Sequence, residues 1–181
     1  MTPMLRQYLE IKEEYPDEIL FYRMGDFYEM FFEDAEVASK ILGITLTSRN
    51  NKADAARIPM CGIPYHAAQT YLAKLVKAGK RVAICEQTED PSQAKGIVRR
   101  EVIRVVTPGV TTDDQILEEN ENRYVCALSR SLSEPVPQWG FSFLDLSTGE
   151  FLTGELEDDS AVPEQLVDHL TRMTPAELLI N

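Results

Sequence analysis

A twelve-residue stretch near the start of the chain, FYRMGDFYEMFF at residues 21–32, constrains the fold more than any other. Its aromatic residues favour extended backbone, and Gly25-Asp26 in its middle predicts a turn. In an extended backbone, residues two positions apart project from the same face. We therefore expect Phe27 and Glu29 to point together, with Tyr28 on the opposite side.

Two interpretations of this stretch follow from the residues. Aromatic side chains in such a run more often lie in a core, and spacing alone favours that buried interpretation. The other interpretation is an apolar wedge beside a hydrogen-bond acceptor. Such a pair could enter the minor groove of a DNA duplex, unstack a weak base step and hold the displaced base by its edge. Under it, Phe27 is the wedge and Glu29 the acceptor.

Helical and extended patterns alternate over residues 1–107 and predict a mixed α/β sandwich. Thr2 and Pro3 open a helix that ends before Pro16. Two further helices are expected at 33–42 and 67–78, each ended by a glycine. The expected strands are 18–24, 44–47, 82–87 and 101–107. Residues 48–57 are expected to form a polar loop, and the proline-bounded segment 59–66 a rigid corner.

A second pattern follows an acidic linker at 113–122, which separates the expected domains 1–112 and 123–181. Strands at 123–130, 139–147 and 149–156, a helix at 163–172 and a strand at 177–180 predict a three-stranded meander followed by a crossover helix. Asp145 and Glu150 fall where a ribonuclease-H-like fold carries carboxylates that bind two Mg²⁺ ions. A metal-dependent nuclease is therefore one alternative, although Asp145 also suits a purely structural role in the Ser147-Thr148-Gly149 turn.

Charge is distributed unevenly along a chain whose net charge is −12. Residues 1–48 carry a net charge of −6, residues 49–107 carry +6, and residues 108–181 carry −12. Only the middle segment suits phosphate, so the pattern predicts a DNA reader that depends on a larger assembly for affinity. The phosphate candidates are Arg49, Lys95, Arg99 and Arg100. The acidic last segment leaves a protein-docking module as a further alternative.

Several chemistries are not indicated by the sequence. There is no G-x-x-x-x-G-K-[ST] motif for nucleotide phosphates, and His66 and His169 lie too far apart to suggest a triad or a metal site. Three widely spaced cysteines predict neither a disulfide framework nor a zinc cluster. Apolar runs fall short of a membrane span, and residues 1–20 are too charged for a signal peptide. We expect a cytoplasmic protein with no metal, cofactor or catalytic residue in this fragment.

Four separated blocks carry a family resemblance: GDFYEMF at 25–31, IPMCGIPYHA at 58–67, AICEQ at 83–87 and VTPGV at 106–110. Together and in this order they resemble the amino-terminal part of the MutS family of bacterial DNA mismatch-repair proteins. The resemblance implies a mixed α/β mismatch-binding domain followed by part of a ribonuclease-H-like connector domain. It also implies that Phe27 and Glu29 read the mismatch, that Arg49 contacts the DNA backbone and that Met60 contacts flanking sugars or bases.

The same resemblance implies properties of a longer parent protein. The parent would be a homodimeric, DNA-dependent ATPase that binds mismatched double-stranded DNA. Its ATP and Mg²⁺ would be held by a carboxy-terminal domain outside residues 1–181, and a MutL-type repair protein would bind through the connector domain.

Overall fold

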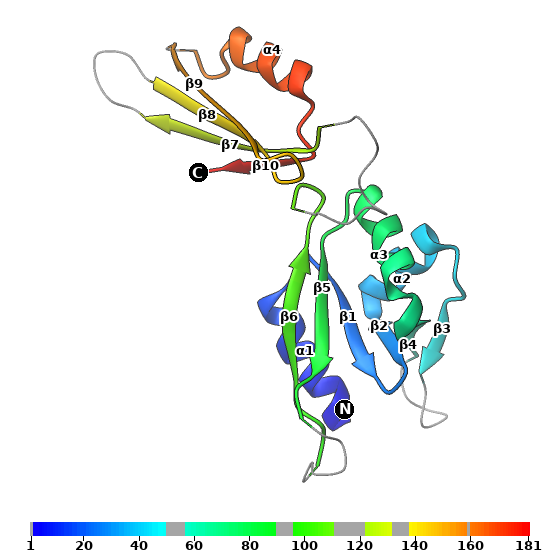
Figure 1. Cartoon of the computed structure of the whole chain (residues 1–181). Helices are drawn as coiled ribbons and strands as arrows, with labels where there is room; N and C mark the ends of the chain where they lie inside the picture. Colours follow the sequence, from blue (N-terminus) through cyan, green and yellow to red (C-terminus); the bar gives the residue numbers. More distant parts are fainter. Residues whose placement is uncertain (1, 50–56, 90–95, 111–121, 132–137, 159) are drawn as a thin grey trace. The chain divides into compact units, whose positions relative to one another are not determined.

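The computed structural model describes residues 2–49, 57–89, 96–110, 122–131, 138–158 and 160–181. The chain divides into two compact units, Met1–Val106 and Thr107–Asn181 (Figure 1). Each unit has a sheet of its own that contains both parallel and antiparallel strand pairs. The predicted α/β class is therefore confirmed.

The first unit contains a six-stranded sheet in the order β3-β4-β2-β1-β5-β6. Strands β1 and β5 are parallel neighbours, and the other pairs are antiparallel. Its elements, in chain order, are α1 Pro3–Glu14, β1 Ile19–Met24, β2 Phe27–Phe31, α2 Phe32–Leu42, β3 Thr47–Arg49, β4 Ile58–Pro64, the 3₁₀ turn η1 Tyr65–Ala67, α3 Ala68–Lys77, β5 Val82–Gln87 and β6 Arg100–Val106.

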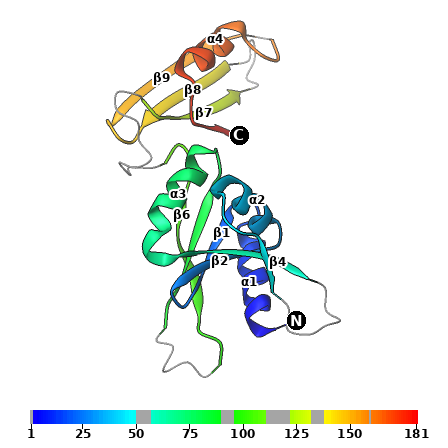
Figure 2. The same cartoon turned by 90° about the vertical axis from the view of Figure 1, so that its right-hand side faces the viewer.

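Helices cover both faces of this sheet (Figures 1 and 2). Helix α1 starts where the sequence predicts, because the Thr2 hydroxyl caps it by accepting from the Leu5 amide at 3.3 Å. Its buried residues, Leu5 and Tyr8, pack with a core that includes Tyr22 and Phe31. Helices α2 and α3 cover the opposite face. The alternation of side chains along each strand thus supplies two cores from one sheet.

Asp34, in the first turn of α2, ties three elements together. Its carboxylate accepts from the Tyr8 hydroxyl at 3.0 Å, from the Lys12 ammonium at 2.9 Å and from the Leu20 amide at 3.0 Å. The carboxylate is buried, so these donors replace the water that it loses on folding. This cluster fixes α1 and β1 against the start of α2.

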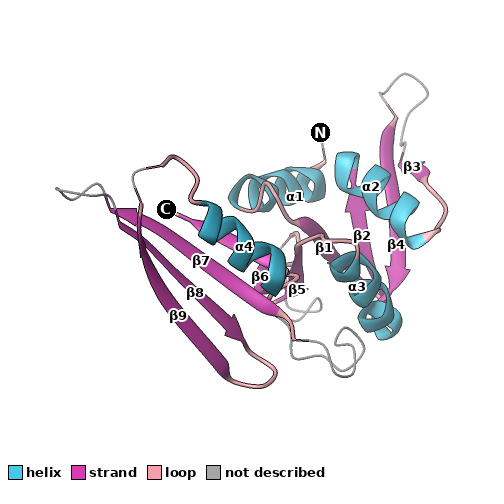
Figure 3. Cartoon of the chain, turned by 90° about the horizontal axis from the view of Figure 1, so that it is seen from above, coloured by secondary structure: helices cyan, strands magenta, loops and turns pink. Residues whose placement is uncertain are grey.

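The second unit is a four-stranded sheet in the order β10-β7-β8-β9, with one helix packed on it (Figure 3). Its elements are β7 Tyr124–Ser131, β8 Gln138–Asp145, β9 Glu150–Glu157, α4 Glu164–Met173 and β10 Glu177–Ile180. β10 pairs in parallel with β7, so α4 is the crossover helix that the sequence predicts. None of the helices in the described part of the chain is long and apolar enough to cross a membrane.

The VTPGV segment is held by the second unit. The carboxylate of Glu177, at the start of β10, accepts from the Thr107 hydroxyl at 2.6 Å and from the Gly109 amide at 3.2 Å. Gly109 packs so closely that an added Cβ would lie 2.5 Å from Cγ2 of Val125. The Thr-Pro-Gly sequence therefore has a structural role, because a residue larger than glycine at position 109 would clash with Val125 of β7.

Two expectations for the first unit are wrong. The strand expected at 44–47 is β3, which begins at Thr47 and includes Arg49, so part of the expected polar loop is a strand. Residues 50–56 lie outside the described residues. The rigid corner expected at 59–66 is mostly β4, which pairs with both β2 and β3. Its two prolines stand second and last in the strand, near the ends, where a missing amide donor disturbs the ladder least.

Candidate nucleic-acid interface

Phe27 is the first residue of β2 and follows a two-residue hairpin turn. Gly25, the first turn residue, has φ +57°, which glycine adopts at little cost and which suits tight hairpins. The turn brings Met24 opposite Phe27, and Pro64 flanks Phe27 on the other side. The sequence signal Gly-Asp between two aromatic runs therefore builds the end of the sheet at which Phe27 stands.

Exposure along one side of β2 falls from its start to its end. Phe27 is 47% exposed, the Glu29 side chain is 19% exposed, and Phe31 is fully buried. These three residues alternate with buried Tyr28 and Met30, which point to the opposite face. Phe31 is buried because Tyr8 of α1 lies edge-on against it, with ring centroids 5.0 Å apart. The same strand face is therefore core at one end and surface at the other.

Gly62 of β4 leaves open space beside the exposed end of this face. It pairs with Glu29 in the β2–β4 register. An added Cβ would lie 3.7 Å from Cγ of Glu29 and 3.8 Å from Cδ1 of Phe27. Because glycine has no side chain, position 62 itself covers neither residue.

Glu29 forms an ion pair with Arg49, the last residue of β3. The two side chains meet at 3.0 Å between Nη1 of Arg49 and Oε2 of Glu29, and the Arg49 side chain is 36% exposed. Partial burial raises the pKa of the Glu29 carboxyl above its ordinary value, while the cationic Arg49 and Arg100 oppose that rise. The structure thus joins two residues that the sequence analysis proposed for separate contacts.

Met60 lies on the same sheet face but is only half-buried. It pairs with Phe31 of β2 and Thr47 of β3, and it packs against the core beneath α1. Its thioether therefore contributes to the core as well as to the surface beside the Glu29–Arg49 pair. Its role toward flanking sugars or bases stays a prediction.

Arg99 and Arg100 do not lie beside Arg49, where the expected clamp would place them. Arg99 and Arg100 lie at β6, whereas Arg49 lies on β3, and these strands form opposite edges of the sheet. Arg99 is largely exposed and pairs with Glu101. Lys95 lies outside the described residues.

Arg100 is held by contacts inside the first unit, and its assignment as a phosphate contact stays a prediction. It is only 8% exposed, and its guanidinium donates to the Arg23 carbonyl at 2.6 Å and to the Val98 carbonyl at 2.8 Å. It also lies over the Tyr22 ring, 4.8 Å from the centroid. Its guanidinium therefore has hydrogen-bond partners inside the first unit.

Comparison with known proteins assigns the chain to a family. The family model described as MutS domain I matches residues 2–115, and the one described as MutS domain II matches residues 123–181. The chain belongs to the MutS family.

Curated relatives in this family are similar along the whole chain. The DNA mismatch repair proteins MutS of Syntrophobacter fumaroxidans, Desulforamulus reducens and Acetivibrio thermocellus are 54%, 51% and 49% identical to it over 181 residues, 100% of the chain. That length is 20% of each relative, so the chain spans about a fifth of the MutS proteins that it matches.

In the MutS domain I part, Tyr65 is a second exposed aromatic that sequence reasoning missed. It directly follows Pro64, the pairing partner of Phe27, and is 44% exposed. The Arg23 guanidinium lies 3.8 Å from its ring centroid, and its amide donates to the Asp26 carbonyl at 2.9 Å. The only signal in the sequence was its place in the IPYHA block, and nothing local predicted the stacking on Arg23.

In the MutS domain II part, the two carboxylates proposed for a nuclease both accept hydrogen bonds within the second unit. Asp145 is buried and accepts from the Arg123 amide at 3.0 Å, the Ser147 amide at 2.8 Å and the Ser147 hydroxyl at 2.7 Å. Burial alone would raise its pKa, but these hydrogen bonds outweigh that effect and lower it. Glu150 accepts from Asn122 at 3.0 Å and from Tyr124. The described residues contain no cluster of three or more His, Cys, Asp or Glu side chains suited to a metal ion.

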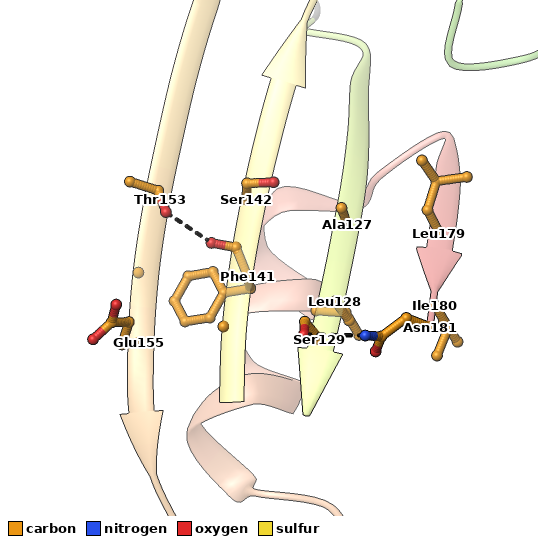
Figure 4. A pocket seen from close by; sticks show the side chains of 12 residues that line it. Ala127, Leu128, Ser129, Phe141, Ser142, Thr153, Glu155, Leu179, Ile180 and Asn181 are labelled. Atoms are coloured by element: carbon orange, nitrogen blue, oxygen red, sulfur yellow. Dashed lines mark hydrogen bonds between the residues drawn. The ribbon is translucent and has the colours of Figure 1, made fainter. Parts of the chain in front are cut away.

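The same part carries a hollow on the face of its sheet away from α4 (Figure 4). It has a volume of about 490 Å³ and is lined by residues of all four strands, among them Ala127, Ser142, Thr153 and Leu179. Small side chains and Gly140 form its floor, so the hollow is a shallow surface depression with no cluster of charged groups.

Proposed function

We propose that this chain recognises mismatched double-stranded DNA for post-replicative mismatch repair. In this proposal, Phe27 inserts into the minor groove beside a mispaired or unpaired base. Glu29 then accepts a hydrogen bond from the edge of the displaced base. The observation that carries the proposal is the exposed Phe27 ring, which stands at the end of a rigid strand on the same face as a carboxylate.

Physical chemistry explains why this pair would select mismatches. Unstacking a base step costs a few kcal/mol, and the cost is lowest where pairing is already damaged. Discrimination then comes from duplex deformability and does not depend on the surrounding sequence. Glu29 repels phosphates unless a base N–H is offered to it, so it adds selectivity more than affinity.

The structure supports one phosphate contact better than the others. Arg49 is partly exposed and lies within an ion pair's reach of Glu29. Arg100 is buried and is left out of the proposal. We propose Arg49 as the backbone contact nearest to Phe27 and Glu29, with Tyr65 beside the Phe27 end of β2 and Met60 farther along the same face.

The family membership extends the proposal to the parent protein. We propose that the parent is a homodimeric DNA-dependent ATPase whose ATP and Mg²⁺ sites lie outside residues 1–181. We also propose that a MutL-type repair protein binds through the second unit. DNA-stimulated ATP hydrolysis by the full-length parent tests the first part, and binding of the MutL-type protein with and without residues 107–181 tests the second.

Removal of the Phe27 ring tests the central claim. In the full-length parent, Phe27→Ala is expected to lower the mismatch-to-matched binding ratio by about 5- to 150-fold, since stacking of one aromatic on a base is worth ~1–3 kcal/mol. The measurement is titration of matched duplex, and of duplex with one unpaired nucleotide, at fixed salt. Weak general binding should persist.

The matched control is Phe151→Ala, which removes a 61% exposed Phe from the second unit. It is expected to leave the ratio unchanged. If Phe27→Ala behaved like Phe151→Ala, the wedge mechanism would be refuted, because an exposed ring without a DNA contact has no effect on discrimination.

A further inference from the structure

The carboxylate proposed to read the displaced base already has a partner within the protein. Oε2 of Glu29 accepts from Nη1 of Arg49 at 3.0 Å. The two residues come from β2 and β3, which are not neighbours but flank β4. The ion pair therefore links two strands that share no backbone hydrogen bonds, across the intervening β4.

This ion pair conflicts with simultaneous DNA contacts by both residues. A base N–H and a guanidinium compete for the same carboxylate, and a phosphate and a carboxylate compete for the same guanidinium. In the proposed complex, Glu29 faces a base edge and Arg49 faces the backbone. The contact seen in the DNA-free chain must loosen before both can form.

The exchange is physically accessible. A partly exposed ion pair is weak, because water screens it and holding two long side chains in one geometry costs entropy. The Arg49 side chain is more exposed than that of Glu29, so the arginine is the partner that a phosphate can reach first. Guanidinium presents the same planar array of donors to phosphate and to carboxylate, so a phosphate can take the place of the carboxylate as its partner.

We propose that Arg49 is a latch on Glu29: it holds the carboxylate in the DNA-free protein and exchanges it for a phosphate only when a displaced base offers Glu29 another hydrogen bond. On matched duplex no such donor is presented, and the latch stays closed. Arg49 then contributes to mismatched binding and little to matched binding. This inference rests on the proposed mismatch-reading function and makes Arg49 a specificity-determining residue.

A simple phosphate contact predicts something different. An arginine that only binds backbone weakens binding to every duplex alike when it is removed. A latch makes the loss depend on the duplex. The two models therefore separate on one comparison, the ratio of mismatched to matched binding in an Arg49 variant.

The experiment is a cycle of Arg49→Met and Glu29→Gln in the full-length parent. Arg49→Met is expected to weaken binding to mismatched duplex by about fivefold, the equivalent of one exposed charge contact, and to leave matched binding nearly unchanged. In the Glu29→Gln background Arg49 is already released, so Arg49→Met should now weaken binding to both duplexes equally. The latch would be overturned if Arg49→Met weakened binding to mismatched and matched duplex equally in the unsubstituted background as well as in the Glu29→Gln background.

Salt dependence gives a second readout that a structural role would not move. Arg49→Met is expected to reduce the slope of log K against log salt by about one for mismatched duplex and to leave the slope for matched duplex unchanged. Arg49→Lys keeps the charge without the planar fork, so it should retain the salt slope but lose part of the discrimination. The same slope change on both duplexes would contradict the proposal.

Controls separate failure of the latch from failure of the proposed function. Arg104→Met removes an exposed arginine of β6 and is expected to change neither the ratio nor the duplex dependence of the salt slope. Phe27→Ala is measured in parallel. Suppose that Phe27→Ala lost discrimination, while the effect of Arg49→Met was the same in the unsubstituted background and in the Glu29→Gln background. The mismatch-reading function would then be supported and the latch would be contradicted. If Phe27→Ala kept discrimination, the function itself would fail.

Discussion

At the scale of single residues, the position of a side chain along β2 matters as much as the face from which it projects. Phe31, Glu29 and Phe27 share a face, yet their burial decreases in that order. The cause is the extent of α1, whose Tyr8 covers Phe31 and leaves Phe27 in solvent. A strand that runs out from under its covering helix can hold an aromatic rigidly and still expose it.

The ionisation of Glu29 gives a first prediction. Burial disfavours the charged carboxylate and raises its pKa, whereas the Arg49 cation favours it. Arg49→Met removes a lowering influence, so the pKa of Glu29 should rise further. Carboxyl ¹³C shifts of the 181-residue chain against pH measure it, with Arg104→Met as the control. An unchanged pKa in Arg49→Met would mean that the ion pair is not formed in solution.

The direction of the linked stability effect follows from the same shift. A raised folded-state pKa means that the folded chain binds the Glu29 proton more tightly than the unfolded chain does. Stability from this group is therefore present at low pH and is lost as pH rises through the folded-state pKa. Glu29→Gln should remove that part of the pH dependence in the acid range.

Gly62 provides a second prediction at this scale. A Cβ at Gly62 would make ordinary contacts of 3.5–3.8 Å with Tyr28, Glu29 and Phe27, so Gly62→Ala should fold with unchanged or slightly higher stability. Gly62→Leu should fill the space beside Phe27 and Glu29 and lower the affinity for mismatched duplex by about tenfold or more. A loss of ~1.4 kcal/mol of binding free energy is enough for a tenfold change. Duplex titration and thermal melting measure the two effects.

The control for this series is Gly140→Leu, on β8 of the second unit, where an added Cβ would meet nothing within 4 Å. It should leave mismatch binding intact. Equal binding by Gly62→Leu and the unsubstituted parent would show that DNA does not approach this side of Phe27.

Residue-level prediction from the sequence succeeded where the signal was local. The two-residue period placed Phe27 and Glu29 together, because alternation is a property of any extended backbone. The burial of Arg100 was not foreseen because its partners are distant in sequence: it donates to the carbonyl of Arg23 and, at 3.1 Å, to Gln7. The Glu29–Arg49 pair was missed for the same reason, since it depends on the order of three strands.

At the scale of elements, the Asp34 cluster supplies the strongest stability prediction. Asp34→Ala removes the acceptor of the Leu20 amide and leaves Lys12 without its carboxylate. Because breaking a buried charge pair is costly, the free energy of unfolding of the first unit should fall by about 3–5 kcal/mol. Chemical denaturation of the 181-residue chain measures the change.

Asp17→Ala is the matched control, because Asp17 is exposed in the turn that follows α1. It should change stability by no more than about 0.5 kcal/mol. A loss of similar size in Asp34→Ala would mean that water replaces the carboxylate without difficulty, and that α1 is not anchored by this cluster.

Elements were predictable wherever caps and periodicity agreed. Thr2-Pro3 fixed the start of α1, and Gly43 ended α2 in the left-handed conformation with φ +67°. β4 was missed because prolines at 59 and 64 suggested a corner, although strand ends tolerate them. The direct passage from β2 to α2 was also not foreseen: Phe32 takes φ +54°, which is rare for an aromatic residue, so the junction needs no loop.

At the scale of the whole molecule, the positive charge of the middle segment is less available than the sequence suggested. Several of its arginines already have acidic partners in the described structure: Arg49 pairs with Glu29, Arg81 with Glu18, and Arg99 with Glu101. Arg100 is buried. The net charge of +6 over residues 49–107 is therefore partly offset by ion pairs in the described part of the chain. Charge counting predicted the sign of the segment, but pairing across strands determines how much of it DNA can meet.

The division into two units predicts two separable unfolding transitions. Each unit has a core of its own: Tyr8 and Tyr22 belong to the first, and Tyr124 and Phe143 to the second. Asp34→Ala should therefore lower the midpoint of one transition and leave the other in place.

Asp145→Asn is the complementary variant. It replaces an oxygen that accepts from the Arg123 amide or the Ser147 amide with a donor, and leaving one such group unsatisfied costs about 1–3 kcal/mol. Only the second transition should move. The lowered pKa of Asp145 adds a pH test. The stability that the ionised carboxylate contributes is present above its unfolded-state pKa and is lost as pH falls through its folded-state pKa. Acid should therefore lower the second transition in the unsubstituted chain more than in Asp145→Asn. A single transition shifted alike by both variants would mean that the two cores unfold as one.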